Sequence, residues 1–192
     1  MNKKLKRTDL RKLNEAYQKM LLWFFSYPTK EISLNDLSTS IKISKTTANR
    51  VVTQLVEEGF LKKEILGKIW RISCNQTHLY NYSLKITNNL RMIYESGIIS
   101  KIHELIPNPI TIILFGSYRK GDDTEKSDID IAVEVLDNEE LRMHQLGIVP
   151  QFGYRINVPV NLHIFSRNKI DLNLFANIAN GIVLEGFLEV RI

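Results

Sequence analysis

Two aspartates stand at alternate positions of a predicted strand, shortly after a Gly-Ser pair. Asp128 and Asp130 belong to the segment SDIDIAVEV, and Gly116 and Ser117 directly follow the apolar run ITIILF. Side chains two apart on a strand lie on one face, about 6.5–7 Å apart at the backbone. Two ionised carboxylates this close repel one another unless a cation lies between them. The pattern therefore predicts that Asp128 and Asp130 bind a divalent cation, Mg²⁺ or Mn²⁺, which accepts carboxylate, water and phosphate oxygens.

The Gly-Ser pair offers groups that could bind a phosphate. Gly116 has no Cβ, so the backbone can approach a ligand closely. Ser117 adds a backbone N–H and a hydroxyl at the start of a short helical turn, and Arg119 follows with a positive charge. The alternative is an acidic strand face without a function, but Asp is disfavoured in strands. We expect a site for a metal-bound phosphate compound.

The segment GSYRKGDDTEKSDIDIAV resembles the signature of the minimal nucleotidyltransferases of the DNA polymerase β superfamily, which is G-S-x-x-x-G, a short loop and S-D-I-D. The segment FANIANGIVLEG is similar to the part that closes those small domains. The resemblance covers about residues 108–187. It implies a mixed, mostly antiparallel sheet flanked by helices, and transfer of NMP from an NTP to a hydroxyl group. The resemblance also implies roles for particular residues, with Asp128 and Asp130 as catalytic metal ligands and a nucleotide-binding set of Gly116, Ser117, Arg119 and Ser127.

The sequence departs from the family where a third carboxylate is expected. That position falls on the segment VPVNLHIFS and holds Asn161, with His163 on the same face of the strand. An amide is a weaker ligand for a hard cation and does not accept a proton near neutral pH. Three accounts remain open. The alignment is displaced, or His163 acts as the base, or the domain binds nucleotide and metal through Asp128, Asp130 and Asn161 while transferring little. An ordinary, partly buried strand histidine is the simplest interpretation of His163.

Charge is divided unevenly along the 192 residues. Residues 1–75 have a net charge of +8, residues 76–107 of +1, and residues 108–192 of −4. A basic block suits a polyanionic partner, whereas an acidic block suits cations.

The basic block resembles a winged helix-turn-helix in the segment SLNDLSTSIKISKTTANRVVTQLVEEGFLKKE. Ser33 and Ser44 are predicted N-caps of the second and third helices, and Gly67-Lys68 is predicted at the turn of a following hairpin. The resemblance implies binding of double-stranded DNA through the third helix and the wing. We expect these contacts from Lys45, Thr46, Thr47, Asn49, Arg50 and Lys68. The alternative is a three-helix module that binds a protein.

Residues 76–107 are predicted to form a helical linker. Apolar residues at positions 79, 82, 86, 90 and 93 define the expected buried stripe, and Gly97 is expected to break the helix. The linker either packs on the next domain or forms a homodimer interface. We expect Glu134 at the surface and Asp122, Asp123 and Glu125 in a solvated loop.

The composition narrows the class of protein. A single cysteine, Cys74, excludes an intramolecular disulfide and any multi-cysteine metal cluster, and fits a reducing cytoplasm. No apolar run approaches the length that spans a membrane. We therefore predict a winged helix-turn-helix in residues 1–75, the linker, and an α+β nucleotidyltransferase domain in residues 108–192. Two functions stay open. The first is a nucleotidyltransferase that is recruited to DNA. The second is a DNA-binding regulator or antitoxin-like protein whose transferase domain is weak or inactive and which has a protein partner.

Overall fold

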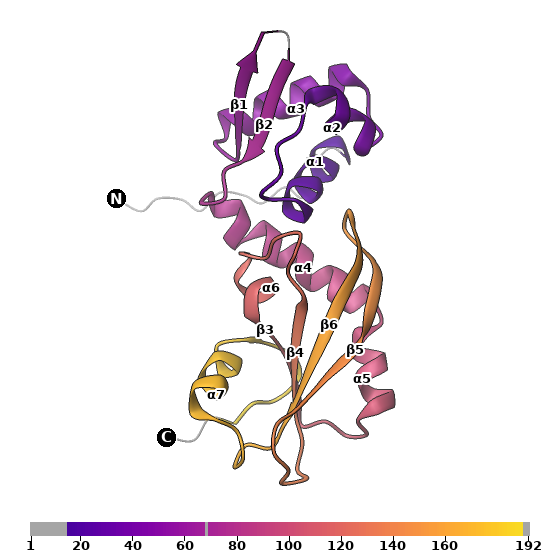
Figure 1. Cartoon of the computed structure of the whole chain (residues 1–192), viewed down its shortest axis with the longest axis vertical. Coiled ribbons are helices and arrows are strands. Elements are labelled where there is room, and N and C mark those ends of the chain that lie inside the picture. Colours follow the sequence, from indigo (N-terminus) through magenta and orange to yellow (C-terminus); the bar gives the residue numbers. More distant parts are fainter. Residues whose placement is uncertain (1–14, 68, 190–192) are drawn as a thin grey trace, which may run out of the picture.

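The computed structural model describes residues 15–67 and 69–189 (Figure 1). The basic segment 1–14 and the predicted wing residue Lys68 lie outside the described residues. Among the described residues, no helix has the length and apolar character that a membrane span requires.

The first five elements form what we call the N-terminal unit. They are α1 (Glu15–Ser26), α2 (Leu34–Ser40), α3 (Lys45–Glu57), β1 (Leu61–Leu66) and β2 (Ile69–Cys74). Both predicted N-caps are present, because Ser33 Oγ accepts from the Asp36 N–H and Ser44 Oγ accepts from the Thr47 N–H. β1 and β2 pair as an antiparallel hairpin. The helix, helix, helix and hairpin order expected from the caps and turn residues is therefore observed.

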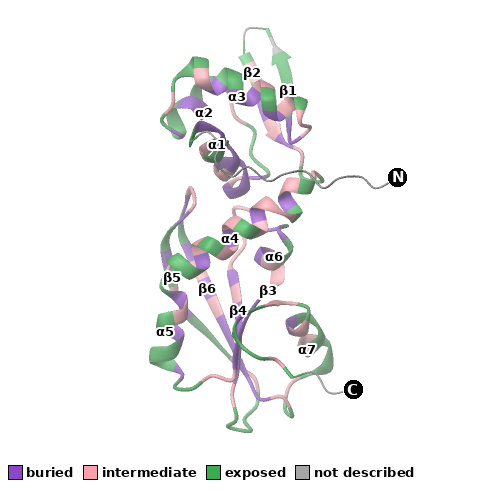
Figure 2. Ribbon diagram, turned by 180° about the vertical axis from the view of Figure 1, so that it is seen from behind, coloured by how far each residue is buried: buried purple, intermediate pink, exposed green. Residues whose placement is uncertain are grey.

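The N-terminal unit has its own apolar core. Phe24 of α1, Leu37 of α2, Leu55 of α3 and Phe60 before β1 are fully buried in it. Figure 2 shows this buried core as separate from the one around the large sheet.

A helical segment follows, and its buried face differs from the expected one. It comprises η2 (Leu79–Tyr82), α4 (Leu84–Glu95) and α5 (Ile98–Leu105). Leu79 and Tyr82 are exposed, and α4 instead buries Lys85, Asn89 and Ile93. The predicted apolar stripe was wrong for Leu79 and Tyr82, whereas Ile93 is fully buried and Leu90 packs partly against the same core. Lys85 and Asn89, which were not expected on the buried face, are buried in a polar network. The predicted break is present, since Gly97 adopts a φ of 78° between α4 and α5.

The remaining strands form one five-stranded mixed sheet in the order β5-β6-β4-β3-β7. β4 and β6 run parallel, and the other neighbours are antiparallel. The elements of this part are β3 (Thr111–Phe115), α6 (Gly116–Lys120), β4 (Ile129–Glu134), β5 (Arg142–Phe152), β6 (Arg155–Phe165), α7 (Leu172–Ala179) and β7 (Ile182–Gly186). The expected mixed, mostly antiparallel sheet flanked by helices is confirmed.

The two faces of the sheet are covered unequally. Ile129, Ile131 and Val133 of β4 point to the face that packs against α4 and α5. Ile113 and Ala132 point to the opposite face, where Ile178 of α7 packs on them. Figure 1 shows α7 over only the lower part of that second face. Asp130 lies on the same strand as Ala132, at the end of β4 that pairs with Phe115, and is only partly buried.

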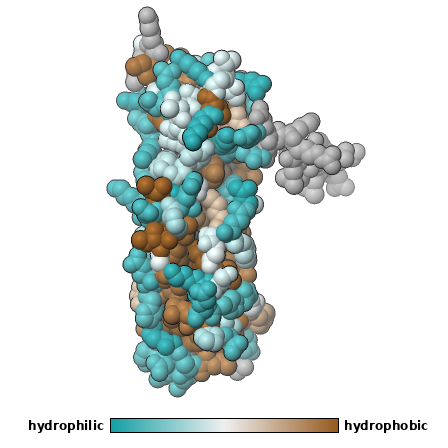
Figure 3. Space-filling view, turned by 90° about the vertical axis from the view of Figure 1, so that its right-hand side faces the viewer, coloured by the Kyte–Doolittle hydropathy of each residue, from teal (hydrophilic) through white to brown (hydrophobic). Residues whose placement is uncertain are grey.

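One edge of the sheet exposes apolar side chains. β5 is an edge strand, and its Met143 and Ile148 are exposed. Figure 3 views the side of the molecule that contains β5 and α5, and apolar atoms gather along the middle of that face.

Candidate functional site

The Gly-Ser pair lies against the second aspartate. β3 is buried along its whole length and leads directly into α6, which begins at Gly116. Gly116 has a φ of 71°, and a Cβ added there would lie 2.7 Å from Asp130 Oδ2. A larger residue would therefore be strained and would also collide with the carboxylate. This close approach explains why glycine stands at the end of β3.

The two aspartates point toward one amide. Asp128 lies one residue before β4, Asp130 lies within it, and both are half-buried. Asn161 on β6 is the parallel-strand partner of Asp130. Its Nδ2 lies 3.4 Å from Asp128 Oδ2 and 3.4 Å from Asp130 Oδ1. The structure thus brings Gly116, Asp128, Asp130 and Asn161 together at the ends of β3, β4 and β6.

These side chains fit a hard divalent cation. No group of three His, Cys, Asp or Glu suited to a metal occurs among residues 15–67 and 69–189, so the donors here are two carboxylates and one amide. Mg²⁺ is commonly bound by one or two carboxylates together with waters and substrate phosphates. Rotation of the Asn161 amide about its last bond would turn Oδ1, a possible ligand, toward the aspartates. The Asn161 amide donates weak hydrogen bonds to both carboxylates, which partly compensates their repulsion.

His163 is a neighbour of the site with restricted access. Its Nε2 lies 3.7 Å from Asp130 Oδ1, which is beyond hydrogen-bonding distance. The ring packs edge-on against Phe115, with the centroids 4.9 Å apart. Its Nδ1 is buried and has no hydrogen-bond partner within the described structure. This geometry favours a packed strand histidine over a base that reaches a substrate.

Ser127 and Arg119 have different environments. The Ser127 hydroxyl accepts from the Thr124 N–H at 2.9 Å and so closes the turn before Asp128. Its carbonyl accepts from Arg155 Nη2 at 2.7 Å. Arg119 is half-buried in α6 and makes no hydrogen bond or ion pair with the described residues. The Ser127 hydroxyl is thus engaged within its own turn, whereas the Arg119 guanidinium has no partner among the described residues.

A buried polar network supports α6 and the following loop. Lys85 Nζ lies 3.2 Å from Asp123 Oδ2, and Asn89 donates to Asp123 Oδ1 at 2.9 Å and to the Tyr118 carbonyl at 3.2 Å. Burial raises the pKa of Asp123 and lowers the pKa of Lys85, and each partner counteracts the shift of the other. The expectation of a solvated loop was wrong for Asp123, because α4 supplies a buried cation for it. Lys85 and Asn89, one helical turn apart, were the available signal in the sequence.

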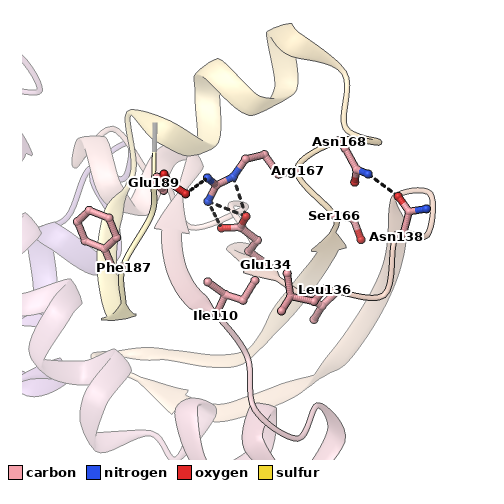
Figure 4. Close-up of a pocket in the computed structure, with 10 residues that line it drawn as sticks. Ile110, Glu134, Leu136, Asn138, Ser166, Arg167, Asn168, Phe187 and Glu189 are labelled. Carbon is pink, nitrogen blue, oxygen red and sulfur yellow. Dashed lines mark hydrogen bonds and ion pairs between the residues drawn. The ribbon is translucent and has the colours of Figure 1, made fainter. Parts of the chain in front are cut away.

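Glu134 is also buried, contrary to the expected surface position. Arg167 binds both of its carboxylate oxygens, at 2.8 and 3.0 Å, in a cavity of about 670 Å³ (Figure 4). Arg167 further contacts Glu189 at 3.1 Å. Glu134 lies at the far end of β4 from Asp128, so this cavity is separate from the aspartate site. Glu134 is paired with Arg167 and does not add a carboxylate to the site that contains Asp128 and Asp130.

The predicted DNA-contacting residues lie at the start of α3. Lys45, Thr46, Asn49 and Arg50 are exposed, and Thr47 is half-buried with its N–H on the Ser44 cap. In the hairpin, Lys63 lies over the Trp70 ring with its Nζ 4.1 Å from the centroid. The exposed apolar residues Ile65 and Ile69 flank the hairpin turn. The exposed groups at this end are thus a mixture of cations, amides, hydroxyls and apolar side chains.

Comparison with known proteins adds one finding. Residues 98–186 match a family model described as Polymerase beta, Nucleotidyltransferase. The match begins at α5 and includes Gly116, Asp128, Asp130 and Asn161. A search of curated proteins finds no significant match. The comparison supports a nucleotidyltransferase domain in this part of the chain.

Proposed function

We propose that the C-terminal part of the chain, residues 108–192, binds an NTP together with Mg²⁺ or Mn²⁺ and transfers NMP to an acceptor hydroxyl. The observation that supports this most is the convergence of Asp128 and Asp130 beside Gly116, where only glycine fits. The match of residues 98–186 to the nucleotidyltransferase family model agrees with it.

Each residue of the site has a distinct part in this reaction. Asp128 and Asp130 would hold the cation, and Asn161 would complete the set with its amide oxygen. Gly116 lets the backbone approach the phosphates, and Ser117 and Arg119 supply a hydroxyl and a positive charge. The bound cation would neutralise phosphate charge and lower the pKa of the acceptor hydroxyl.

The transfer exchanges one phosphorus–oxygen bond for another. The acceptor oxygen bonds to the α-phosphorus, the bond to the α–β bridging oxygen breaks, and pyrophosphate leaves. Asn161 cannot accept the hydroxyl proton, which therefore passes to water. Without a carboxylate in this position, the domain is expected to be a slow transferase.

The N-terminal unit, in this proposal, is a winged helix-turn-helix that binds double-stranded DNA. The exposed Lys45, Asn49 and Arg50 at the start of α3 would reach base edges and phosphates in the major groove. The transferase would then act close to DNA.

A second candidate is a DNA-binding regulator or antitoxin-like protein whose nucleotidyltransferase domain binds nucleotide but is catalytically weak. Asn161 favours it, because a third carboxylate is absent from the position beside Asp130. The exposed apolar residues of β5 would then serve a protein partner or a second copy of the chain.

Labelled nucleotide distinguishes the two candidates. The protein is incubated with ATP labelled at the α-phosphate, Mg²⁺ or Mn²⁺, and a cell lysate. Label transfer that is lost in Asp130→Asn supports the transferase. Nucleotide binding without transfer at either metal supports the regulator, and transfer that persists in Asp130→Asn contradicts the assignment of the site.

A further inference from the structure

We infer that Arg155 is a positioning residue through which the N-terminal unit sets the geometry of the nucleotide site. The inference rests on the proposed function, because it takes the Asp128–Asp130 face to be a site for a metal-bound nucleotide.

Arg155 joins the two segments that form the site. It is the first residue of β6 and is 7% exposed. Its Nη2 donates to the Ser127 carbonyl at 2.7 Å, and its Nη1 donates to the Tyr118 hydroxyl. Ser127 directly precedes Asp128, and Tyr118 lies on α6 two residues after Gly116. One buried guanidinium therefore connects α6, which begins at Gly116, to the segment that carries Asp128.

The bonds of Arg155 are made without an acidic partner. No salt bridge of Arg155 occurs in the described part of the chain, and its acceptors are neutral oxygens. A buried charge is costly unless its hydrogen bonds are well made. Its position is thus tightly tied to the Ser127 carbonyl and the Tyr118 hydroxyl.

The residue before Arg155 is held by the N-terminal unit. The tip of the β5–β6 hairpin reaches the end of α1 (Figure 1). The Tyr27 hydroxyl donates to the Tyr154 carbonyl at 2.6 Å, and the Tyr154 N–H donates to Ser26 Oγ at 3.0 Å. At Gly153, where φ is 63°, an added Cβ would lie 2.6 Å from Ser26 Oγ. The tip is therefore shaped for close contact with Ser26 and Tyr27.

A second contact reaches the other side of the site. The Thr29 hydroxyl donates to the Glu125 carboxylate, which lies in the loop between α6 and β4. The other oxygen of Glu125 is buried. The short segment from Ser26 to Thr29 thus holds both the hairpin that supplies Arg155 and the loop that leads to Asp128. A displacement of this segment is transmitted to the aspartates through Arg155 and Ser127.

Removal of single hydroxyl groups tests this connection. Binding of Mn²⁺·ATP and Mn²⁺·GTP to the full chain is measured by calorimetry. Tyr27→Phe removes the bond to the Tyr154 carbonyl and keeps the ring, so we expect at least about fivefold weaker binding, with a loss of melting temperature similar to that of the control below. The matched control is Tyr94→Phe, which removes a 2.8 Å hydroxyl bond to the Leu184 carbonyl, away from the site. The control should bind like the wild type.

Two substitutions of Arg155 test its own role, one that removes the positive charge and one that keeps it. Arg155→Met should weaken nucleotide binding more than Tyr27→Phe does. Arg155→Lys should bind nucleotide more tightly than Arg155→Met but less tightly than wild type, because lysine keeps the charge but reaches fewer acceptors. If Arg155→Met does not fold, the comparison of Tyr27→Phe with Tyr94→Phe decides. Equal affinity of wild type and Tyr27→Phe would overturn the inference while leaving the proposed function intact. A wild-type protein that binds neither nucleotide would overturn both.

Discussion

Asn161 stands directly beside Asp130 on the neighbouring parallel strand, and its amide nitrogen is 3.4 Å from a carboxylate oxygen of Asp130. It makes the same contact with Asp128, again at 3.4 Å. In the proposed metal site, a neutral side chain therefore occupies the position of a third carboxylate. The metal affinity and the catalytic rate should both depend on this one residue.

Asn161→Asp should strengthen metal binding. A third carboxylate adds an anionic ligand, and we expect about tenfold tighter Mn²⁺ binding, equivalent to about 1.4 kcal/mol, together with faster NMP transfer. In the presence of a chelator the same variant should melt at a lower temperature than wild type, because three carboxylates repel one another. Calorimetry measures the affinity for Mn²⁺, thermal melting in a chelator measures the change in stability, and transfer from ATP labelled at the α-phosphate measures the rate.

The matched control is Gln145→Glu. Gln145 pairs with Asn161 across β5 and β6 and is exposed, so the change adds the same charge one strand further from the aspartates. An equal gain in Mn²⁺ affinity in both variants would mean that Asn161 is not at the metal site.

Gly116→Ala should abolish nucleotide binding and destabilise the fold. The new methyl group would meet Asp130 Oδ2 at 2.7 Å, on a backbone with positive φ. Gly97→Ala is the control, since Gly97 has a φ of 78° but an added Cβ meets nothing within 4 Å. Both variants suffer backbone strain, so only the excess loss in Gly116→Ala reports the collision. Urea unfolding and nucleotide calorimetry should show that excess, and equal effects would argue against the contact.

Asp123→Asn should destabilise the protein by about 3–5 kcal/mol. The change removes the carboxylate that pairs with Lys85 and leaves the lysine buried without an opposite charge. Asp122→Asn, at the neighbouring exposed position, should change stability by no more than about 0.5 kcal/mol. Urea unfolding measures both. A small effect for Asp123→Asn would show that Lys85 is solvated in solution.

Alkaline pH should destabilise the protein partly through Cys74. Burial raises the pKa of this thiol from 9.0 to about 11. Between these values the unfolded chain has lost the thiol proton and the folded chain has kept it, so a rise in pH favours unfolding. The contribution is up to about 2.7 kcal/mol, at about 1.36 kcal/mol for each pKa unit.

Cys74→Ala isolates this contribution from the other groups that titrate at high pH. The free energy of unfolding of wild type should fall more steeply between pH 9 and pH 11 than that of the variant. Parallel stability curves would show that the thiol ionises equally in both states.

Arg50→Ala should weaken DNA binding and its dependence on salt. If Arg50 contacts a phosphate, its loss lowers the slope of log K against log salt by about 1. Arg91→Ala removes the same charge from an exposed position on α4 and should leave the slope unchanged. Equal slopes for the two variants would mean that Arg50 does not contact a DNA phosphate. An absence of DNA binding in the wild type would exclude this role for the N-terminal unit.

Much of the fold could be predicted because its signals are local. Ser33 and Ser44 cap the helices that follow them, and Gly97 separates α4 from α5. The Gly-Ser pair and the alternate aspartates predicted a compact site at the ends of β3 and β4. These features depend on periodicity, caps and positive φ angles, which are properties of a few consecutive residues.

The sequence by itself thus determined the order of elements and the face on which Asp128 and Asp130 lie. Only the tertiary structure decided what surrounds them. The register of β4 against β6 places Asn161 beside Asp130. Asp123 lies in a loop, but it is buried against α4 and forms an ion pair with Lys85. The β5–β6 hairpin, which contacts Tyr27 through Tyr154, places Arg155 against the carbonyl of Ser127. Strand register and burial depend on residues far apart in the chain, so no short stretch of sequence specifies these neighbours.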